Sequence, residues 1–458
     1  MEVVILAAGK GSRMFSDKPK VLHSIGGSAM LEHVVRTSRA LHPQKIHTVI
    51  GFGVQQIKDY FARSNTADLT WVLQAEQLGT GHAVQQALPG INIEDGENQV
   101  LVLYGDVPLI QTSTLQELLS QTDGETLALL TVLTENPTGL GRIIRNTAGE
   151  VTRIVEERDA NSEQKQINEV NSGIMCVPAT KLVRWLGEIR NDNDQSEYYL
   201  TDLIALAADE NCQINAITLA DEIEVQGVND KTQLALLERH YQMNKQQELL
   251  DQGVTLRDPE RVEVRGELSC GKDCVVDINV IFEGTVSLGN NVVIGANTVI
   301  KDAVIEDGAH VLPGTNIDGA TIGANSLIGP YARIRPGTVL GANVKIGNFV
   351  ETKNAILGEG SKANHLAYIG DAEIGRNCNI GAGTIFCNYD GANKHKSTLG
   401  DNVFIGSNSV LVAPVVLANN AFVAAGSAVN CDVPADSLAV ARSKQRNIPD
   451  WKRPTKGQ

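Results

Sequence analysis

The sequence predicts a two-domain protein, in which an open α/β sheet flanked by helices precedes a β-solenoid of hexapeptide repeats. The solenoid is predicted by aliphatic residues that return at every sixth position over much of Val276 to Val429. Neither the helical period nor strand alternation gives that spacing, whereas a triangular coil of three six-residue sides does. The sheet is predicted by strand-like segments that alternate with helix-like segments before residue 228. A chain of 458 residues also exceeds what one hydrophobic core usually holds.

The N-terminal part contains short apolar runs that are typical of buried parallel strands. These runs are Val3–Leu6, Thr48–Ile50, Val100–Leu103 and Leu127–Val132. Between them, Met30–Leu41 and Gly81–Leu88 have helical spacing of apolar residues. We therefore expect residues 1–229 to form one domain.

A linker helix is expected over residues 230–250. Asp230 followed by Gln233 resembles a capping pair, and Leu234, Leu237 and Tyr241 then fall on one helix face. Asn229 is read in two ways at this point, as a functional side chain or as the cap of the helix. The third segment, residues 251–458, holds the solenoid and a polar C-terminal tail.

The six-residue phase predicts a solenoid that begins near Val254 and ends near Val433. The phase resets at Ile305 and Ile322, and it is lost between Ile346 and Ile374. His365 lies in that interval, which we interpret as an interruption of the repeat. A second stretch without the six-residue phase, residues 387–396, predicts a projecting loop, and such loops concentrate function on rigid scaffolds.

Composition restricts the class of protein. A net charge of −15 argues against a general nucleic-acid-binding or anionic-membrane surface. The seven cysteines are scattered, and Cys270 and Cys274 lack a second pair at zinc-site spacing, so reduced thiols are expected. No apolar run reaches the roughly 20 residues of a membrane span, and the N-terminal run is too short for a signal peptide. We therefore predict a cytoplasmic protein.

A glycine-rich loop follows the first predicted strand. In residues 9–13 (GKGSR), backbone N–H groups are free to approach an anion, and Arg13 and Lys20 add positive charge. The spacing matches neither the dinucleotide-binding nor the Walker motif. A site for a polyphosphate is expected here.

Several longer motifs resemble those of a known protein family. Residues 6–14 (LAAGKGSRM), 18–20 (KPK), 74–83 (QAEQLGTGHA) and 104–109 (YGDVPL) resemble the motifs of sugar-nucleotide pyrophosphorylases. Together with a hexapeptide solenoid that contains residues 364–368 (NHLAY), the chain resembles bacterial bifunctional N-acetylglucosamine-1-phosphate uridylyltransferase/glucosamine-1-phosphate acetyltransferases. The resemblance implies a Rossmann-like nucleotidyltransferase domain and a left-handed parallel β-helix, and a supply of precursors for peptidoglycan and lipopolysaccharide.

By this resemblance, the N-terminal domain transfers a uridylyl group from UTP to N-acetylglucosamine 1-phosphate and releases pyrophosphate. Asp106 and Asn229 would bind Mg²⁺, Arg13 and Lys20 the triphosphate, and Gln74, Gly79 and Thr80 the uracil. Gly141, Glu156 and Asn171 would bind the sugar. The implied substrate-binding set also includes Leu6, Ala7, Ala8, Gly9, Tyr104 and Gly105.

The resemblance likewise implies that the β-helix transfers an acetyl group from acetyl-CoA to glucosamine 1-phosphate. His365 would be the general base, since histidine titrates near neutral pH. Arg335 and Lys353 would hold the phosphate. The remaining implied contacts are Tyr368, Asn379, Asn388, Tyr389 and Lys394 for the sugar phosphate and thioester, and Ala382, Ser407, Ala425 and Arg442 for acetyl-CoA.

The family forms homotrimers through parallel solenoids, so a homotrimer is expected here. Two alternatives stay open at this point. The first is a nucleotidyltransferase with a single activity and a structural or regulatory solenoid, and the second is a non-catalytic scaffold. Release of CoA in the presence of glucosamine 1-phosphate distinguishes the bifunctional enzyme from the first, and binding of Mg·UTP distinguishes it from the second.

Overall fold

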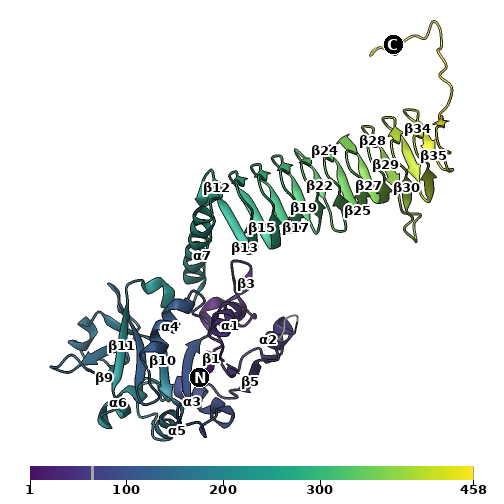
Figure 1. Ribbon diagram of the computed structural model, residues 1–458. Helices are drawn as coiled ribbons and strands as arrows, with labels where there is room; N and C mark the ends of the chain where they lie inside the picture. The colour runs from purple at the N-terminus through teal and green to yellow at the C-terminus, as the bar shows by residue number, and fades with distance from the viewer. Residues whose placement is uncertain (63–65, 457–458) are drawn as a thin grey trace. The chain divides into compact units, whose positions relative to one another are not determined.

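The computed structural model describes residues 1–62 and 66–456 (Figure 1). The chain divides into two compact units, Met1–Tyr241 and Gln242–Gln458. No helix within the described residues is long and apolar enough to cross a membrane.

The first unit contains a mixed sheet covered by helices on both faces. The strand order is β11-β7-β10-β6-β1-β4-β5, and a β8–β9 hairpin pairs with β10. The strands are β1 (Glu2–Ala7), β4 (Ile46–Ile50), β5 (Leu69–Leu73), β6 (Gln99–Tyr104), β7 (Leu127–Leu133), β8 (Arg142–Arg145), β9 (Val151–Val155), β10 (Glu169–Pro178) and β11 (Ile214–Leu219), with a separate β2 (Ser24–Ile25) and β3 (Ser28–Ala29) pair.

Two apolar layers hold the helices on the sheet. Neighbouring residues of a strand point to opposite faces, so Val4 belongs to one core and Ile5 to the other. Helices α1 (Met30–Ala40), α2 (Val54–Phe61) and α4 (Thr112–Ser120) cover the Ile5 side. Helices α3 (Thr80–Ala87), α5 (Ala179–Leu186) and α6 (Asp202–Asp209) cover the Val4 side.

The predicted strands and the two predicted helices are present, but the sheet is not wholly parallel. Strand β7 pairs with β11 in parallel and with β10 in antiparallel orientation. Strand β10, which the sequence did not predict, lies between β6 and β7 and is antiparallel to both, so the predicted strands β6 and β7 still run in the same direction. Its sequence is nearly continuously apolar from Ile174 to Val177, which marks burial but not direction.

Helix α7 (Lys231–Asp251) occupies the expected linker segment, and the two compact units divide within it. Asp230 is its cap, because the Asp230 Oδ1 atom accepts a hydrogen bond from the Gln233 N–H (2.9 Å). The Gln233 side chain in turn accepts from the Asn229 N–H (2.7 Å). The side chain of Asn229 is therefore available for another role.

The second unit is a left-handed parallel β-helix whose coils stack strand on strand (Figure 1). One face consists of β12 (Thr255–Leu256), β14 (Val275–Val276), β16 (Val293–Ile294), β18 (His310–Val311), β21 (Leu327–Ile328), β24 (Lys345–Asn348), β26 (Lys362–His365), β28 (Asn379–Ile380), β31 (Phe404–Ile405), β34 (Phe422–Val423) and β36 (Leu438–Ala439). The other strands are β13 (Val262–Cys270), β15 (Val280–Leu288), β17 (Val299–Ile305), β19 (Asn316–Asp318), β20 (Thr321–Ile322), β22 (Arg333–Ile334), β23 (Val339–Leu340), β25 (Glu351–Leu357), β27 (Tyr368–Ile374), β29 (Ile385–Cys387), β30 (Ser397–Leu399), β32 (Val410–Val412), β33 (Val415–Leu417) and β35 (Ala428–Val429).

The six-residue aliphatics form the core of this unit, as predicted. Val276 stacks on Ile294, Ile294 on Val311 and Val311 on Ile328 in successive coils. All four are buried, and each contributes roughly 1.5–3 kcal/mol through removal from water. The phase resets correspond to coil sides of five rather than six residues, as from Ile300 to Ile305.

Two expectations about the solenoid are wrong. Residues 347–373 are not an interruption, because β25, β26 and β27 continue the coils there. The inward positions hold Thr352 and Ala363, which the aliphatic pattern does not mark. The solenoid also continues past Val433 to β36, where the inward residue is the small Ala439 and Leu438 is exposed.

The seven cysteines are all free thiols. Among the described residues, no group of three or more His, Cys, Asp or Glu side chains could hold a metal ion.

Candidate functional site

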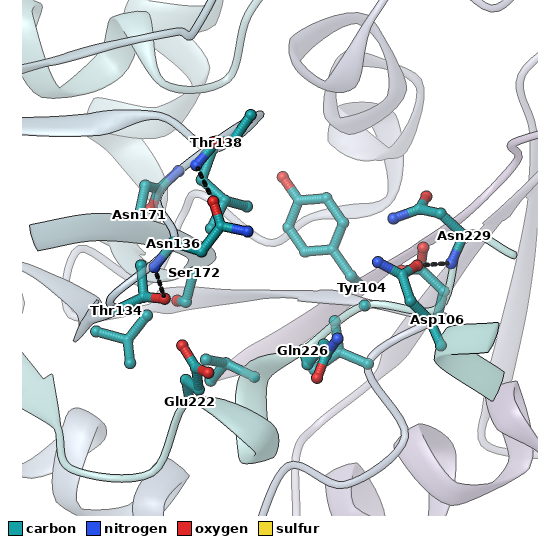
Figure 2. Close-up of a pocket in the computed structure, with 16 residues that line it drawn as sticks. Tyr104, Asp106, Thr134, Asn136, Thr138, Asn171, Ser172, Glu222, Gln226 and Asn229 are labelled. Carbon is teal, nitrogen blue, oxygen red and sulfur yellow. Dashed lines mark hydrogen bonds between the residues drawn. The ribbon is translucent and has the colours of Figure 1, made fainter. Parts of the chain in front are cut away.

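Two neighbouring cavities lie in the first unit, and they share Tyr104 and Asp106 as wall residues. The larger cavity has a volume of about 480 Å³ and the smaller about 310 Å³. Both shared residues lie at the carboxyl end of β6, which is where open α/β sheets bind ligands. In Figure 2, the Tyr104 ring stands between Asn171 and Asn136 on one side and Asp106 and Asn229 on the other.

The smaller cavity brings together much of the implied nucleotide set. Its wall contains Leu6, Ala7, Ala8, Gly9, Lys20, Gln74, Gly79, Thr80, Tyr104 and Asp106. Gly105 packs behind this wall, where its N–H donates to the Leu6 carbonyl (2.9 Å). Arg13 lies on a short 3₁₀ turn, Ser12–Met14; it is exposed and lines neither cavity.

The uracil contacts expected from the resemblance form a buried polar corner. The Gln74 Nε2 atom donates to the Gly79 carbonyl (3.3 Å) and lies 3.0 Å from His82 Nδ1. Gly79 has φ +112°, and a Cβ there would lie 2.6 Å from the Tyr198 carbonyl oxygen. Only glycine fits this position, so the backbone beside Gln74 is fixed by the chain that follows α5.

Asp106, Asn229 and Lys20 come from three distant segments and meet at one point. The Lys20 Nζ atom forms an ion pair with Asp106 Oδ2 and donates to Asn229 Oδ1 (3.3 Å). A carboxylate oxygen and an amide oxygen thus converge on one positive charge. This donor set suits a hard divalent cation that keeps several waters.

The larger cavity contains Asn171 from the implied sugar set, while Gly141 and Glu156 lie behind it. The Asn171 N–H donates to the Gly141 carbonyl (2.8 Å), and Gly141 packs against Ile154 and Glu156. Burial raises the pKa of Glu156, although the hydroxyl of Thr201 donates to its Oε1 atom (3.0 Å). Burial also raises the pKa of Tyr104, and the nearby Glu156 and Asp106 carboxylates add to the shift.

Several wall residues of the larger cavity were not predicted from the sequence. They are Thr134, Asn136, Thr138, Ser172, Glu222, Gln226 and Gln233 (Figure 2). Most of them lie on loops and short turns, whereas Ser172 lies on β10 and Gln233 in α7. The sequence marked Ser172 only as the neighbour of Asn171 and Gln233 only as part of the capping pair, and it did not predict that either lines a cavity.

In the second unit, the implied phosphate residues share one corner of the β-helix. Lys353 follows Arg335 by one coil of 18 residues, and Lys394 contacts Lys353 and lowers its pKa. Arg335 pairs with Glu351 (2.7 Å). This concentration of positive charge suits a phosphate group, because a bound anion offsets the repulsion among the neighbouring cations.

Tyr368 and Asn388 lie on the same side of this corner. The Asn388 Nδ2 atom donates to Tyr368 Oη (3.4 Å) and to Asp371, a partner that the sequence did not suggest. Tyr389 is exposed, and its hydroxyl donates to the Gly391 carbonyl (2.6 Å) within the predicted loop. A bridge between Tyr389 and Lys394 gives this loop the form of a small hairpin.

His365 is exposed at the end of β26 and begins a column of residues on successive coils. The Gly383 N–H donates to the His365 carbonyl (3.4 Å), and the Asn408 N–H donates to the Ala382 carbonyl (2.7 Å). The Gly426 N–H donates to the Ser407 carbonyl (2.8 Å). The column therefore runs from His365 through Ala382 and Ser407 to Ala425.

Arg442 closes this column, since its Nη1 atom donates to the Ala425 carbonyl (2.7 Å). All four implied acetyl-CoA residues are thus brought to one corner. Asn379 lies on the adjoining strand β28, where it pairs with Lys362 and Phe404.

Comparison with known proteins agrees with the folds of both compact units. Residues 3–162 match the MobA-like NTP transferase domain, and residues 264–350 and 328–425 match the GMPPB C-terminal domain. The fold and site together define a nucleotidyltransferase joined to a hexapeptide β-helix.

Full-length relatives define the family more narrowly. The chain is 56% identical to the bifunctional protein GlmU of Marinobacter nauticus, over 100% of this chain and 99% of that protein. It is 54% identical to GlmU of Stutzerimonas stutzeri and 55% identical to GlmU of Azotobacter vinelandii, with the same coverage. The chain belongs to the GlmU family of bifunctional proteins, which are uridylyltransferases and acetyltransferases that make UDP-N-acetylglucosamine.

Proposed function

We propose that residues 1–229 carry the uridylyltransferase site and residues 251–458 the acetyltransferase site, with residues 230–250 as the linker. The observation that supports this division most directly is that the two residue sets belong to different compact units. The Lys20–Asp106–Asn229 cluster lies in the first unit, and the column from His365 to Ala425 lies in the second.

In the uridylyl transfer, a phosphate oxygen of N-acetylglucosamine 1-phosphate attacks the α-phosphorus of UTP, and the bond to the β-phosphate breaks. The smaller cavity holds the nucleotide, with Gln74, Gly79 and Thr80 at the uracil and residues 6–9 along the phosphates. The larger cavity holds the sugar, with Gly141, Glu156 and Asn171 behind or along its wall. Tyr104 and Asp106, which line both cavities, stand where the two substrates meet.

Mg²⁺ is the proposed metal, held by Asp106 and Asn229, and it neutralises charge on the phosphates when it is bound. Arg13 and Lys20 supply further positive charge for the triphosphate and the departing pyrophosphate. Arg13 is exposed on its turn, so this role requires the turn to move toward the bound nucleotide.

In the acetyl transfer, the amine of glucosamine 1-phosphate attacks the thioester carbonyl of acetyl-CoA, and CoA leaves as a thiolate that takes up a proton. His365 accepts the proton that the amine must lose. Arg335 and Lys353 bind the phosphate, with Tyr368, Asn379, Asn388, Tyr389 and Lys394 around the sugar and thioester. Ala382, Ser407, Ala425 and Arg442 line the path of acetyl-CoA.

The active form of the enzyme is proposed to be a cytoplasmic homotrimer that supplies cell-wall and lipopolysaccharide precursors. Support for association comes from side chains such as Tyr331 and Phe349, which stack face to face at 5.8 Å although both are largely exposed. Exposed aromatic pairs of this kind are typical of surfaces that pack against another chain.

Release of free thiol from acetyl-CoA tests this proposal. We expect release that depends on glucosamine 1-phosphate and that falls roughly 10²–10⁴-fold in His365→Ala, the usual contribution of a general base. His310→Ala is the matched control, because His310 is exposed on an earlier coil of the same face. Wild-type protein without amine-dependent release would instead favour a single-activity nucleotidyltransferase with a structural solenoid.

A further inference from the structure

The Lys20 ammonium occupies the position where the proposed metal ligands converge. Its Nζ atom contacts both Asp106 Oδ2 and Asn229 Oδ1. The side chains of Lys20 and Asp106 are only 13% and 16% exposed, so the pair is largely shielded from water. A cation of the chain itself therefore occupies the point at which the two oxygen atoms converge.

The neighbouring backbone fixes this arrangement. A Cβ on Gly11 would lie 2.6 Å from Lys20 Cβ and 3.2 Å from its Cγ and Cδ, so the lysine stem packs directly on the glycine loop. The Val228 N–H donates to the Asp106 carbonyl (2.9 Å), which holds the segment before Asn229 against the end of β6. The three groups are therefore held together by the fold.

Two cations compete for the same oxygen atoms. A divalent ion that binds Asp106 must either displace the ammonium or stand beside it, and repulsion between the two charges is strong in a shielded site. A triphosphate along the glycine loop offers Lys20 another anionic partner, since the loop and the lysine line the same cavity. A triphosphate bound there would therefore compete with Asp106 for the Lys20 ammonium.

We propose that Lys20 is an internal counter-cation that keeps the metal site closed until a nucleoside triphosphate draws its ammonium away. The metal and the nucleotide then bind with positive coupling, and nucleotide-free protein has little affinity for divalent ions at Asp106. This inference depends on the proposed metal site at Asp106 and Asn229, and it adds a positioning role for Lys20 in the nucleotide-free state.

The test is titration of Mn²⁺ into nucleotide-free, full-length protein, with the free ion followed by electron paramagnetic resonance. Lys20→Met keeps most of the stem and removes the charge, so Mn²⁺ affinity is expected to rise about tenfold or more. The rise is expected to disappear in Lys20→Met/Asp106→Asn. Lys20→Arg, which keeps a cation, is expected to bind Mn²⁺ as weakly as wild type.

Lys18→Met is the matched control, because it removes the same charge two residues away while Lys20 still pairs with Asp106. Its Mn²⁺ affinity is expected to match that of wild type. Thermal unfolding checks that each variant is folded, and Lys20→Gln replaces Lys20→Met if the latter unfolds.

Unchanged or weaker Mn²⁺ binding in folded Lys20→Met or Lys20→Gln would overturn the inference, as would a rise that persists with Asp106→Asn. Measurement of pyrophosphate release distinguishes failure of the proposed function from failure of this inference alone. If Asp106→Asn alone retains uridylyl transfer, Asp106 is not the metal ligand of the reaction. If that activity is lost while Lys20→Met leaves Mn²⁺ affinity unchanged, only the counter-cation role is wrong.

Discussion

Gly383 donates its backbone N–H to the carbonyl oxygen of His365 over 3.4 Å, across two successive coils of the β-helix. This contact places the proposed general base one coil before Ala382, the first of the proposed acetyl-CoA residues. Because parallel coils repeat the same backbone path, residues at one corner form a straight column. The repeat itself therefore aligns the proposed acetyl-CoA residues with the proposed general base.

Arg442 marks the far end of that column. We expect Arg442→Ala to raise KM for acetyl-CoA roughly tenfold or more, since a hydrogen bond to a charged group contributes about 1.5–3 kcal/mol. KM for glucosamine 1-phosphate should stay the same. Steady-state kinetics with each substrate varied in turn measures both values, and Arg446→Ala is a control in the same exposed segment. A change confined to the glucosamine 1-phosphate KM would contradict the assignment.

The close approach of Gly173 to Tyr104 gives a second prediction. Gly173 has φ +85°, and a Cβ there would lie 2.5 Å from the Tyr104 ring. Gly139 has nearly the same φ, +83°, but no described atom lies within 4 Å of its Cβ position. Both substitutions to alanine carry the backbone strain of roughly 1–2 kcal/mol, and only Gly173→Ala also displaces Tyr104.

We therefore expect Gly173→Ala to lower the melting temperature further than Gly139→Ala does, and to reduce kcat/KM for uridylyl transfer at least tenfold. Acetyl transfer should be unaffected in both variants. Calorimetry and the two activity assays measure these effects. Equal behaviour of the two variants would mean that the position of Tyr104 is unimportant for the site.

The stability of the first unit should depend on Asp202, at the start of α6. Burial, with a smaller contribution from the Asp159 carboxylate, raises the pKa of Asp202 to about 6. A raised pKa in the folded state means that folding favours the neutral carboxyl of Asp202. The stability that this neutral carboxyl contributes is fully present below the unfolded-state pKa of 3.8 and is lost as pH rises through the folded-state pKa of about 6. Asp202→Asn keeps the neutral state at every pH.

Asp202→Asn should consequently be more stable than wild type at pH 7 to 8 and gain nothing below about pH 4, as measured by thermal unfolding across that range. Asp209→Asn, an exposed position at the other end of α6, is the control and should show a much smaller pH dependence. An equal gain at all pH values would indicate that ionisation of Asp202 does not oppose folding.

The sequence predicted the β-helix better than the sheet. A six-residue aliphatic repeat has few structural solutions, and the buried positions it marks, such as Val276 and Ile294, are all inward. It missed inward Thr352, Ala363 and Ala439, because small or polar residues complete a coil without an aliphatic signal. In the sheet, β10 was not predicted, and although its run Ile174–Val177 is apolar, strand direction depends on long-range pairing that no local pattern encodes.

The residues of the candidate uridylyltransferase site were likewise predicted only in part. Asp106 and Asn229 were predicted by motifs, and the structure brings their side chains to a common lysine. The competing interpretation of Asn229 as a helix cap was settled only by the structure, in which Asp230 is the cap. Glu222 and Gln226 could not be found from the sequence, since polar residues on a turn acquire meaning only from the cavity they face.

The most direct test of the two-site account is a paired assay of Asp106→Ala and His365→Ala, with pyrophosphate release and thiol release followed for each. Asp106→Ala should lose uridylyl transfer and keep acetyl transfer near the wild-type rate, and His365→Ala should show the reverse. A mixture of the two variants should then convert glucosamine 1-phosphate, acetyl-CoA and UTP to UDP-N-acetylglucosamine. Loss of both activities in either folded variant would contradict the assignment of one independent reaction to each unit.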